Sequence, residues 1–183
     1  MKKKSHLSAA GVLAILAFST PLLAQNQALP NTPNPNAPAP RQAGKLSHAD
    51  RNFFEEAAKS GMKEVEVSNA VKGRLANAQV REFAVMMASD HSAANSELQA
   101  LAAAKGVALP AAKKDFTQKW TKKDGDIDED YVETMEEDHE EAVKLFEKAS
   151  KSDDPEIAAF AQKTLPKLRQ HLETVRTLKR TVK

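Results

Sequence analysis

From Ser47 to the end of the chain, apolar residues recur at intervals of three and four positions, and no segment alternates apolar and polar residues as a half-buried strand does. This spacing predicts an all-α fold with amphipathic helices over about residues 48–75, 78–105, 126–150 and 154–181. Short turns near residues 76 and 152 and a longer connection at 106–125 join them. Because such helices bury their apolar faces against one another, we expect an antiparallel four-helix bundle.

Residues that prefer helix ends mark several of these boundaries. Asn77 is suited to cap the start of the second helix, and Asp153 or Asp154 the start of the fourth, with Pro155 at its first position. Gly106 is placed to end the second helix, because glycine adopts the left-handed backbone of a helix C-terminus at little cost.

The first predicted helix has a glycine on its apolar stripe. We expect the missing side chain of Gly61 to let a neighbouring helix come close. The alternative is that Ser60 and Gly61 break this segment into two helices. The inward positions of the first helix are Phe54, Ala58, Gly61, Val65, Ser68 and Leu75.

A repeated pattern links the second and third predicted helices. The segment FAVMMASDHSAANSEL at residues 83–98 aligns without gaps with YVETMEEDHEEAVKLF at 131–146. An aromatic residue, a methionine and an Asp-His pair recur at the same helical spacing. The repeat predicts two related helices with polar notches at the edge of their buried faces.

The two ends of the chain differ in character. Residues 1–24 combine three lysines, a short apolar run and a small residue at Ala24, which is typical of a secretory signal peptide. Residues 25–45 hold five of the nine prolines and predict a disordered linker, so the folded domain is expected over 46–183. We therefore expect export to the periplasm, with an inner-membrane anchor formed by an uncleaved leader as the alternative.

Composition narrows the function classes. Lys2, Lys3 and Lys4 leave with the leader, so 24 of the 27 basic residues remain beside 25 acidic residues. A nearly neutral mature chain has no global attraction to nucleic acid. The chain has no cysteine, no Gly-x-Ser-x-Gly turn and no glycine-rich phosphate loop, which argues against an enzyme of these classes.

Four ordered motifs carry a resemblance to a known family. They are FFEEAAKSGMKEVEVSNAV, VREFAVMMASDHSAANSELQALAAAKGVALP, YVETMEEDHEEAVKLFEKAS and FAQKTLPKLRQHL. Over about residues 48–178 the chain resembles the bacterial family called domain of unknown function 4142, often labelled as membrane proteins. The resemblance implies an exported protein with a ferritin-like helical bundle, and it implies no established reaction. The Pro-rich linker and the segment KKDFTQKWTKKDGD depart from the usual pattern of that family.

The Asp-His pairs are candidates for a transition-metal site. Both pairs straddle the edge of the buried stripe, so both imidazoles can turn inward. Counted from the turn near residue 76, Glu64 and His91 lie level to about 4 Å. We consider a mononuclear site of Glu64, His91 and His139, with Asp90 or Asp138 as hydrogen-bonded support. The candidate ligands are Glu64, Asp90, His91, Asp138 and His139, with His171 and Glu136 as second choices.

Two observations weigh against richer metal chemistry. Glu136 and His139 have the Glu-x-x-His spacing of a di-iron site, but Ala88 and Leu168 stand where matching glutamates are needed. Counted from the turn near residue 152, His139 and His171 differ in level by about 9 Å. His171 is instead level with Tyr131, which predicts a hydrogen bond between them. The competing hypothesis is an interior layer of polar residues that bond one another without metal.

A lysine-rich connection is the candidate partner surface. Basic residues interleaved with aromatic residues favour contact with anionic lipid or an acidic polymer, and a solvated loop with its aromatics tucked against the helices is the alternative. The residues concerned are Lys113, Lys114, Lys119, Trp120, Lys122 and Lys123. Taken together, the sequence favours a non-catalytic envelope or stress-associated interaction module over a metal-binding ferritin-like protein.

Overall fold

The computed structural model describes residues 46–111 and 115–182, and these residues form five α-helices and no strand. The all-α prediction is confirmed for this part of the chain. The signal peptide predicted over 1–24 and the linker predicted over 25–45 lie outside it. The helices are α1 (His48–Val71), α2 (Ala78–Ala104), α3 (Gln118–Thr121), α4 (Asp128–Ala149) and α5 (Pro155–Lys179).

Side-chain caps start three of the four long helices. The Asn77 carboxamide accepts hydrogen bonds from the first turn of α2, and Asp154 does the same for α5, where Pro155 is the first helical residue. Both predicted caps are confirmed. Ser47 and Asp50 form a reciprocal capping box at α1, which the sequence analysis did not single out.

Gly106 ends α2 as predicted. Its φ is 67°, in the left-handed region that glycine adopts without steric cost. The amide of Val107 then donates to the carbonyl of Ala102 at 2.8 Å, which satisfies an otherwise unpaired carbonyl of the last turn.

α1 is continuous through Gly61, so the alternative of two shorter helices is wrong. A Cβ atom on Gly61 would lie 2.0 Å from Oδ1 of Asn95 on α2, so the glycine admits its neighbour as predicted. The buried stripe of α1 is wider than predicted, and at its middle Glu64 and Val67 are buried whereas the predicted Val65 is half-buried. A stripe drawn through apolar residues misses a buried carboxylate.

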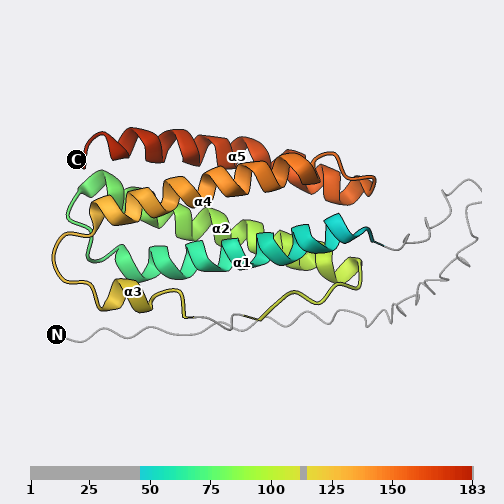
Figure 1. Ribbon diagram of the computed structural model, residues 1–183, viewed down its shortest axis with the longest axis horizontal. Helices are drawn as coiled ribbons and strands as arrows, with labels where there is room; N and C mark the ends of the chain where they lie inside the picture. Colours follow the sequence, from blue (N-terminus) through green and yellow to red (C-terminus); the bar gives the residue numbers. More distant parts are fainter. Residues whose placement is uncertain (1–45, 112–114, 183) are drawn as a thin grey trace, which may run out of the picture. The chain divides into compact units, whose positions relative to one another are not determined.

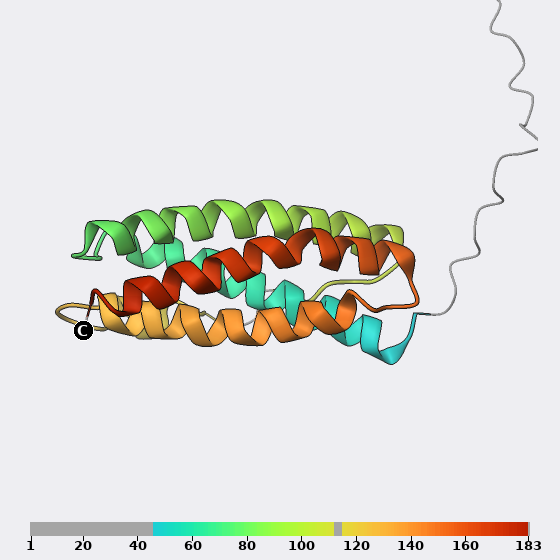
Figure 2. The same ribbon diagram turned by 90° about the horizontal axis from the view of Figure 1, so that it is seen from above.

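The four long helices lie side by side, and each packs against two of the others (Figure 1). α1 packs against α2 and α4, and α5 packs against the same two helices. α2 and α4 therefore face each other diagonally across the interior, as do α1 and α5; the turned view in Figure 2 shows α5 lying over α4 and beside α2. Inward-facing residues at one level of all four helices can meet in the middle.

The buried apolar residues form two clusters at different levels of these helices. On α1, Ala58 belongs to one cluster and Val67 to the other. On α4, Met135 and Ala142 are divided in the same way. Between the two clusters each long helix contributes one buried ionisable residue, and this set, called the polar layer below, comprises Glu64, His91, His139 and His171.

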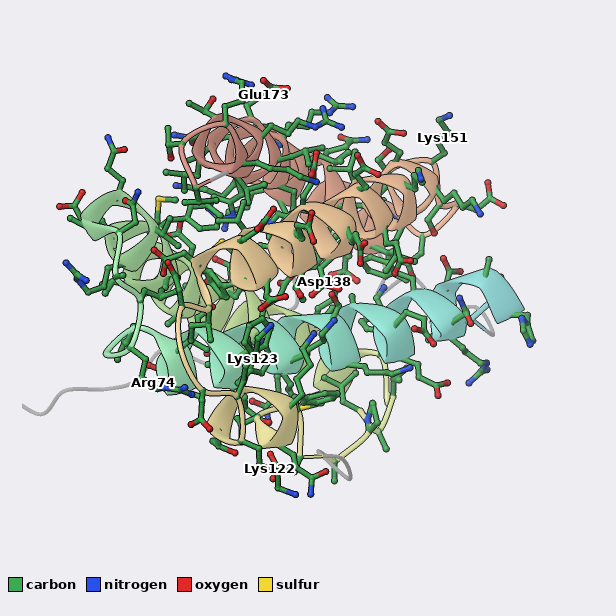
Figure 3. All side chains as sticks on the ribbon, turned by 60° about the vertical axis from the view of Figure 1, so that its left-hand side comes forward. Arg74, Lys122, Lys123, Asp138, Lys151 and Glu173 are labelled. Atoms are coloured by element: carbon green, nitrogen blue, oxygen red, sulfur yellow. The ribbon has the colours of Figure 1, made fainter. Side chains whose placement is uncertain are left out.

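The short helix α3 covers the end of α1 at which Trp120 is buried. The indole ring packs against Tyr131 with ring centroids 6.1 Å apart, and the guanidinium of Arg74 donates to the carbonyls of Trp120 and Lys123. Figure 3 shows Arg74, Lys122 and Lys123 near this short helix. None of the described helices is long and apolar enough to cross a membrane.

These contacts correct the predicted partner surface. Trp120 is only 1% exposed, so its ring is part of the core and is not presented to lipid or polymer. Lys123 pairs with Asp130, while Lys119 lies 4.5 Å from the Trp120 ring centroid. Lys113 and Lys114 lie outside the described residues. For Trp120 the tucked-in alternative therefore holds, and contact of the lysines with lipid or polymer stays a prediction.

Candidate metal centre

The polar layer draws one residue from each long helix because each lies on the buried stripe of its own helix. Glu64 on α1 and His171 on α5 are 1% exposed, His91 on α2 is 6% exposed and His139 on α4 is fully buried. Buried ionisable groups cost free energy unless they find partners. Their hydrogen bonds therefore decide what this layer can do.

Two of the histidines are held from the α1 and α4 side. Nδ1 of His91 lies 2.6 Å from Oε2 of Glu64. Nδ1 of His139 donates to the carbonyl of Met135, one turn earlier on α4, at 2.8 Å and lies 3.8 Å from the second oxygen of Glu64. Each of these imidazoles therefore has its Nδ1 committed.

The third histidine is held from the α2 side. Nε2 of His171 lies 2.9 Å from Oδ2 of Asp90. The ammonium of Lys167 lies 3.3 Å from the same carboxylate oxygen, and the Asp90 side chain is 27% exposed. His171 is thus buried itself but is oriented by a carboxylate that reaches the surface.

The three histidines lie close together. The three imidazole centroids lie 5.4 to 5.5 Å apart, and one potential ligand nitrogen from each histidine lies within 4.8 Å of the other two. Among the described residues, no hydrogen-bond partner reaches Nε2 of His91, Nε2 of His139 or Nδ1 of His171. Each imidazole therefore keeps one nitrogen lone pair for a ligand while its other nitrogen fixes the ring.

Electrostatics favour the ligand form of these side chains. Burial lowers the pKa of His139, with the charge of Glu64 opposing it. Burial also lowers the pKa of His171 to about 4, against the hydrogen bond to Asp90. Burial raises the pKa of Glu64, but the charge and hydrogen bond of His91 outweigh it and leave the pKa below its usual value. At neutral pH the layer thus combines neutral imidazoles at His139 and His171 with one carboxylate, as metal binding requires.

A family model described as Domain of unknown function (DUF4142) matches residues 35–178. The chain belongs to the DUF4142 family. Neither a curated protein nor a solved structure matches the chain. The resemblance based on the four sequence motifs is therefore confirmed, and the polar layer lies wholly inside the DUF4142 match.

In this DUF4142 chain the two Asp-His pairs of the repeat have different partners. His91 and His139 meet in the polar layer as the repeat predicted, but their aspartates diverge. Asp90 supports His171, whereas Asp138 accepts a hydrogen bond from Lys63 on α1 at 2.6 Å, and Figure 3 places it on the α4 side that faces α1. Burial raises the pKa of Asp138, and Lys63 opposes that rise.

Glu136 does not join the polar layer. Its carboxylate accepts a hydrogen bond from Lys179 at 2.7 Å and lies 3.4 Å from Arg176, both on α5. Glu136 therefore takes part in ion pairs at the edge of the α4–α5 contact. These contacts hold its carboxylate away from His91, His139 and His171, which are called the histidine cluster below. Glu136 is therefore not a ligand of that cluster, although the sequence made it a second choice.

The sequence analysis placed His171 at the wrong height along the helices, because it counted residues from the turn and took no account of the direction of the side chains. Side chains on a helix lean toward its N-terminus, so on antiparallel helices they lean in opposite directions along the axis. His139 leans away from the α4–α5 turn and His171 leans toward it, which closes the difference of about 9 Å between their backbone levels. Side-chain direction was the signal in the sequence that could have found this contact.

The predicted bond between Tyr131 and His171 is wrong for the same reason. The Tyr131 hydroxyl instead lies 2.8 Å from Oγ of Ser68 on α1. Burial raises the pKa of Tyr131 well above its usual value, and the Ser68 hydrogen bond opposes the rise. This pair ties α1 to α4 next to the polar layer and contributes no ligand to it.

Proposed function

We propose that this chain binds one divalent transition-metal ion through Nε2 of His91, Nε2 of His139 and Nδ1 of His171. The observation that supports it is a group of three buried histidines that each offer a ring nitrogen within 4.8 Å of the others. Each of them also keeps one ring nitrogen without a hydrogen-bond partner among the described residues. Neutral imidazole is a borderline donor that suits Zn²⁺, Cu²⁺, Ni²⁺ and Co²⁺ better than Mg²⁺ or Ca²⁺.

The surrounding hydrogen bonds match what such a site needs. Metal-binding histidines usually donate their other N–H to a carboxylate or a backbone carbonyl, which fixes the tautomer and the ring. Glu64, Asp90 and the carbonyl of Met135 supply these three acceptors. Three nitrogens bound to one tetrahedral ion at about 2.0–2.1 Å lie about 3.3 Å from one another. The potential ligand nitrogens lie within 4.8 Å of one another here, so each ring moves by at most about 1 Å toward the ion on binding.

The same observation weakens the metal-free hypothesis. An interior polar layer that exists for packing specificity satisfies its hydrogen bonds internally, because each unpaired buried polar group costs about 1–3 kcal/mol. Within the polar layer, three imidazole nitrogens and Oε1 of Glu64 have no hydrogen-bond partner among the described residues, and outside it the same holds for Oδ2 of Asp138. A cation bound by the histidines, with a water beside Glu64, accounts for all four atoms.

We also propose that the four long helices form a ferritin-like four-helix bundle with a mononuclear site in place of the usual two irons. Di-iron sites of that fold take carboxylates from all four helices. The polar layer has a single carboxylate, Glu64, and Glu136 is committed to Lys179. The donor set therefore suits a nitrogen-rich mononuclear centre.

Export to the periplasm is a further part of the proposal, supported by the character of residues 1–24. The full-length chain is expressed in a bacterial host and its N-terminus determined by mass spectrometry of the periplasmic fraction. We expect a chain that begins at Gln25. A chain that stays in the cytoplasm with residue 1 attached would contradict export and leave the metal site untouched.

Metal binding is tested on untagged mature protein, since a histidine tag would itself bind metal. Elemental analysis and calorimetric titration with Zn²⁺ are compared for the wild type, a variant with all three cluster histidines changed to glutamine, and His48→Gln. His48 is exposed at the start of α1 and serves as the matched control. We expect about one ion per chain in the wild type and in His48→Gln, and none in the triple variant.

A folded wild type that binds no transition metal, or a triple variant that binds it equally well, refutes the proposal. A second readout guards against misfolding. Saturating metal at about a thousand times Kd raises the free energy of unfolding by about 4 kcal/mol in the wild type. Circular dichroism shows whether the triple variant keeps its helices.

A further inference from the structure

We infer that a metal ion held by the histidine cluster has an open fourth coordination position, which takes a small exogenous ligand from a cavity lined by all four long helices. This inference rests on the proposed metal site and goes further, because it states that the site is open to ligands and not closed by protein side chains. Structural zinc sites are closed by four protein ligands, whereas three protein ligands and an open position are typical of sites that bind water or substrate.

A cavity of about 40 Å³ reaches the polar layer from one side. Glu64, His91 and His171 are among the residues that line it, and so is the exposed Lys167, so the cavity extends to the surface. A water molecule needs about 10–15 Å³ on this measure. The cavity therefore admits about three water-sized groups, which limits the ligand to two or three non-hydrogen atoms.

The cavity wall provides polar contacts for such a ligand. Oε1 of Glu64 is buried and has no hydrogen-bond partner among the described residues, although Oε2 is held by His91. A carboxylate oxygen in that state accepts a hydrogen bond from a metal-bound water or from a protonated ligand. Lys167 also lines the cavity, and its ammonium is balanced by the Asp90 carboxylate 3.3 Å away, so the approach carries both charges.

Gly61 and Asn95 shape one wall of the same cavity. The Asn95 amide occupies the space that a side chain at position 61 would fill, with only 2.0 Å between its Oδ1 and a Cβ built there. Gly61 lies one turn before Glu64, and Asn95 lies one turn after His91. Because Gly61 has no side chain, the Asn95 amide can lie in the wall of the cavity. Any larger residue at position 61 would displace this amide.

Thr164 lines the cavity from α5 and allows access to be tested separately from metal binding. Its hydroxyl donates only to the Phe160 carbonyl of its own helix, at 2.9 Å. Thr174 lies further along α5, and its hydroxyl makes the same kind of bond, to the Gln170 carbonyl at 2.9 Å. It is half-buried like Thr164, but it does not line the cavity. Thr164→Leu narrows the cavity, and Thr174→Leu is its matched control.

The experiment uses mature protein loaded with Co²⁺, whose visible spectrum reports coordination number, and titrates it with azide. We expect a saturable spectral change in the wild type and in Thr174→Leu. In Thr164→Leu we expect the apparent azide affinity or association rate to fall at least tenfold at unchanged Co²⁺ stoichiometry.

The outcomes separate this inference from the proposal beneath it. Protein that binds one Co²⁺ but shows no azide response has a closed site, which overturns the inference and keeps the proposed function. An azide response that is equal in Thr164→Leu and Thr174→Leu means that the ligand does not use this cavity, which also overturns it. Protein that binds no Co²⁺ refutes the metal site itself.

Discussion

Replacing His171 by glutamine removes a buried titrating group of the polar layer. Burial lowers the pKa of this imidazole from 6.5 in the unfolded chain to about 4 in the folded protein. Between these values the unfolded chain takes up a proton that the folded protein does not. The metal-free protein therefore loses stability as pH falls from about 6.5 to about 4, and is most stable above that window.

The size of the effect follows from the same two values. A fall in pKa from 6.5 to about 4 corresponds to about 3 kcal/mol, or about 1.4 kcal/mol for each pH unit within the window. The side chain is 1% exposed, so solvent screening reduces this little. In His171→Gln the slope of the free energy of unfolding against pH should be smaller by about 1.4 kcal/mol per pH unit within this window. This holds whatever the substitution does to stability at pH 7.

The assay is urea unfolding followed by circular dichroism at half-unit steps from pH 4 to pH 7.5, with chelator present throughout. The exposed His48→Gln variant is the control and should keep the wild-type slope. Other carboxylates and His139 titrate in both proteins, so the difference between the two curves reports His171 together with Asp90, whose pKa the hydrogen bond of His171 lowers. Parallel curves for the wild type and His171→Gln would refute the reasoning.

Three further predictions concern the fold, and each is measured as a change in the free energy of unfolding by urea. Trp120→Ala should cost about 3–5 kcal/mol, because the ring is 1% exposed; a cost below about 1 kcal/mol would show that the ring is not part of the core. Gly106→Ala should cost about 1 kcal/mol, because φ is 67° there, and Gly73→Ala, which has open space and no positive φ, should not; equal costs would contradict this. Tyr131→Phe should cost about 1–2 kcal/mol by leaving the buried Ser68 hydroxyl unpaired, and Ser68→Ala should cost no more on top of it; additive losses would rule out the shared bond.

Local sequence was sufficient for three helix ends, the start and end of α2 and the start of α5. Asn77 and Asp154 cap helices, and Gly106 ends one, through bonds to residues only two to five positions away. Such contacts form in the same way whatever the rest of the chain does. The buried stripe of α4 was predictable for a similar reason, because its apolar period is regular.

The two Asp-His pairs show where local sequence stops being informative. Asp90 and Asp138 occupy equivalent positions in the repeat, yet one orients His171 and the other pairs with Lys63. α2 borders α5 at that edge, whereas α4 borders α1. The neighbouring helix, which no local pattern encodes, decides the partner of each carboxylate.

The sequence by itself determined that the chain forms amphipathic helices, where α2 begins and ends, where α5 begins, and that histidines lie on their buried faces. These properties depend on the spacing and type of nearby residues. Only the tertiary structure decided that His171 joins His91 and His139, because that contact depends on the relative level of antiparallel helices and the opposite lean of their side chains. The candidate metal centre exists only where all four long helices meet.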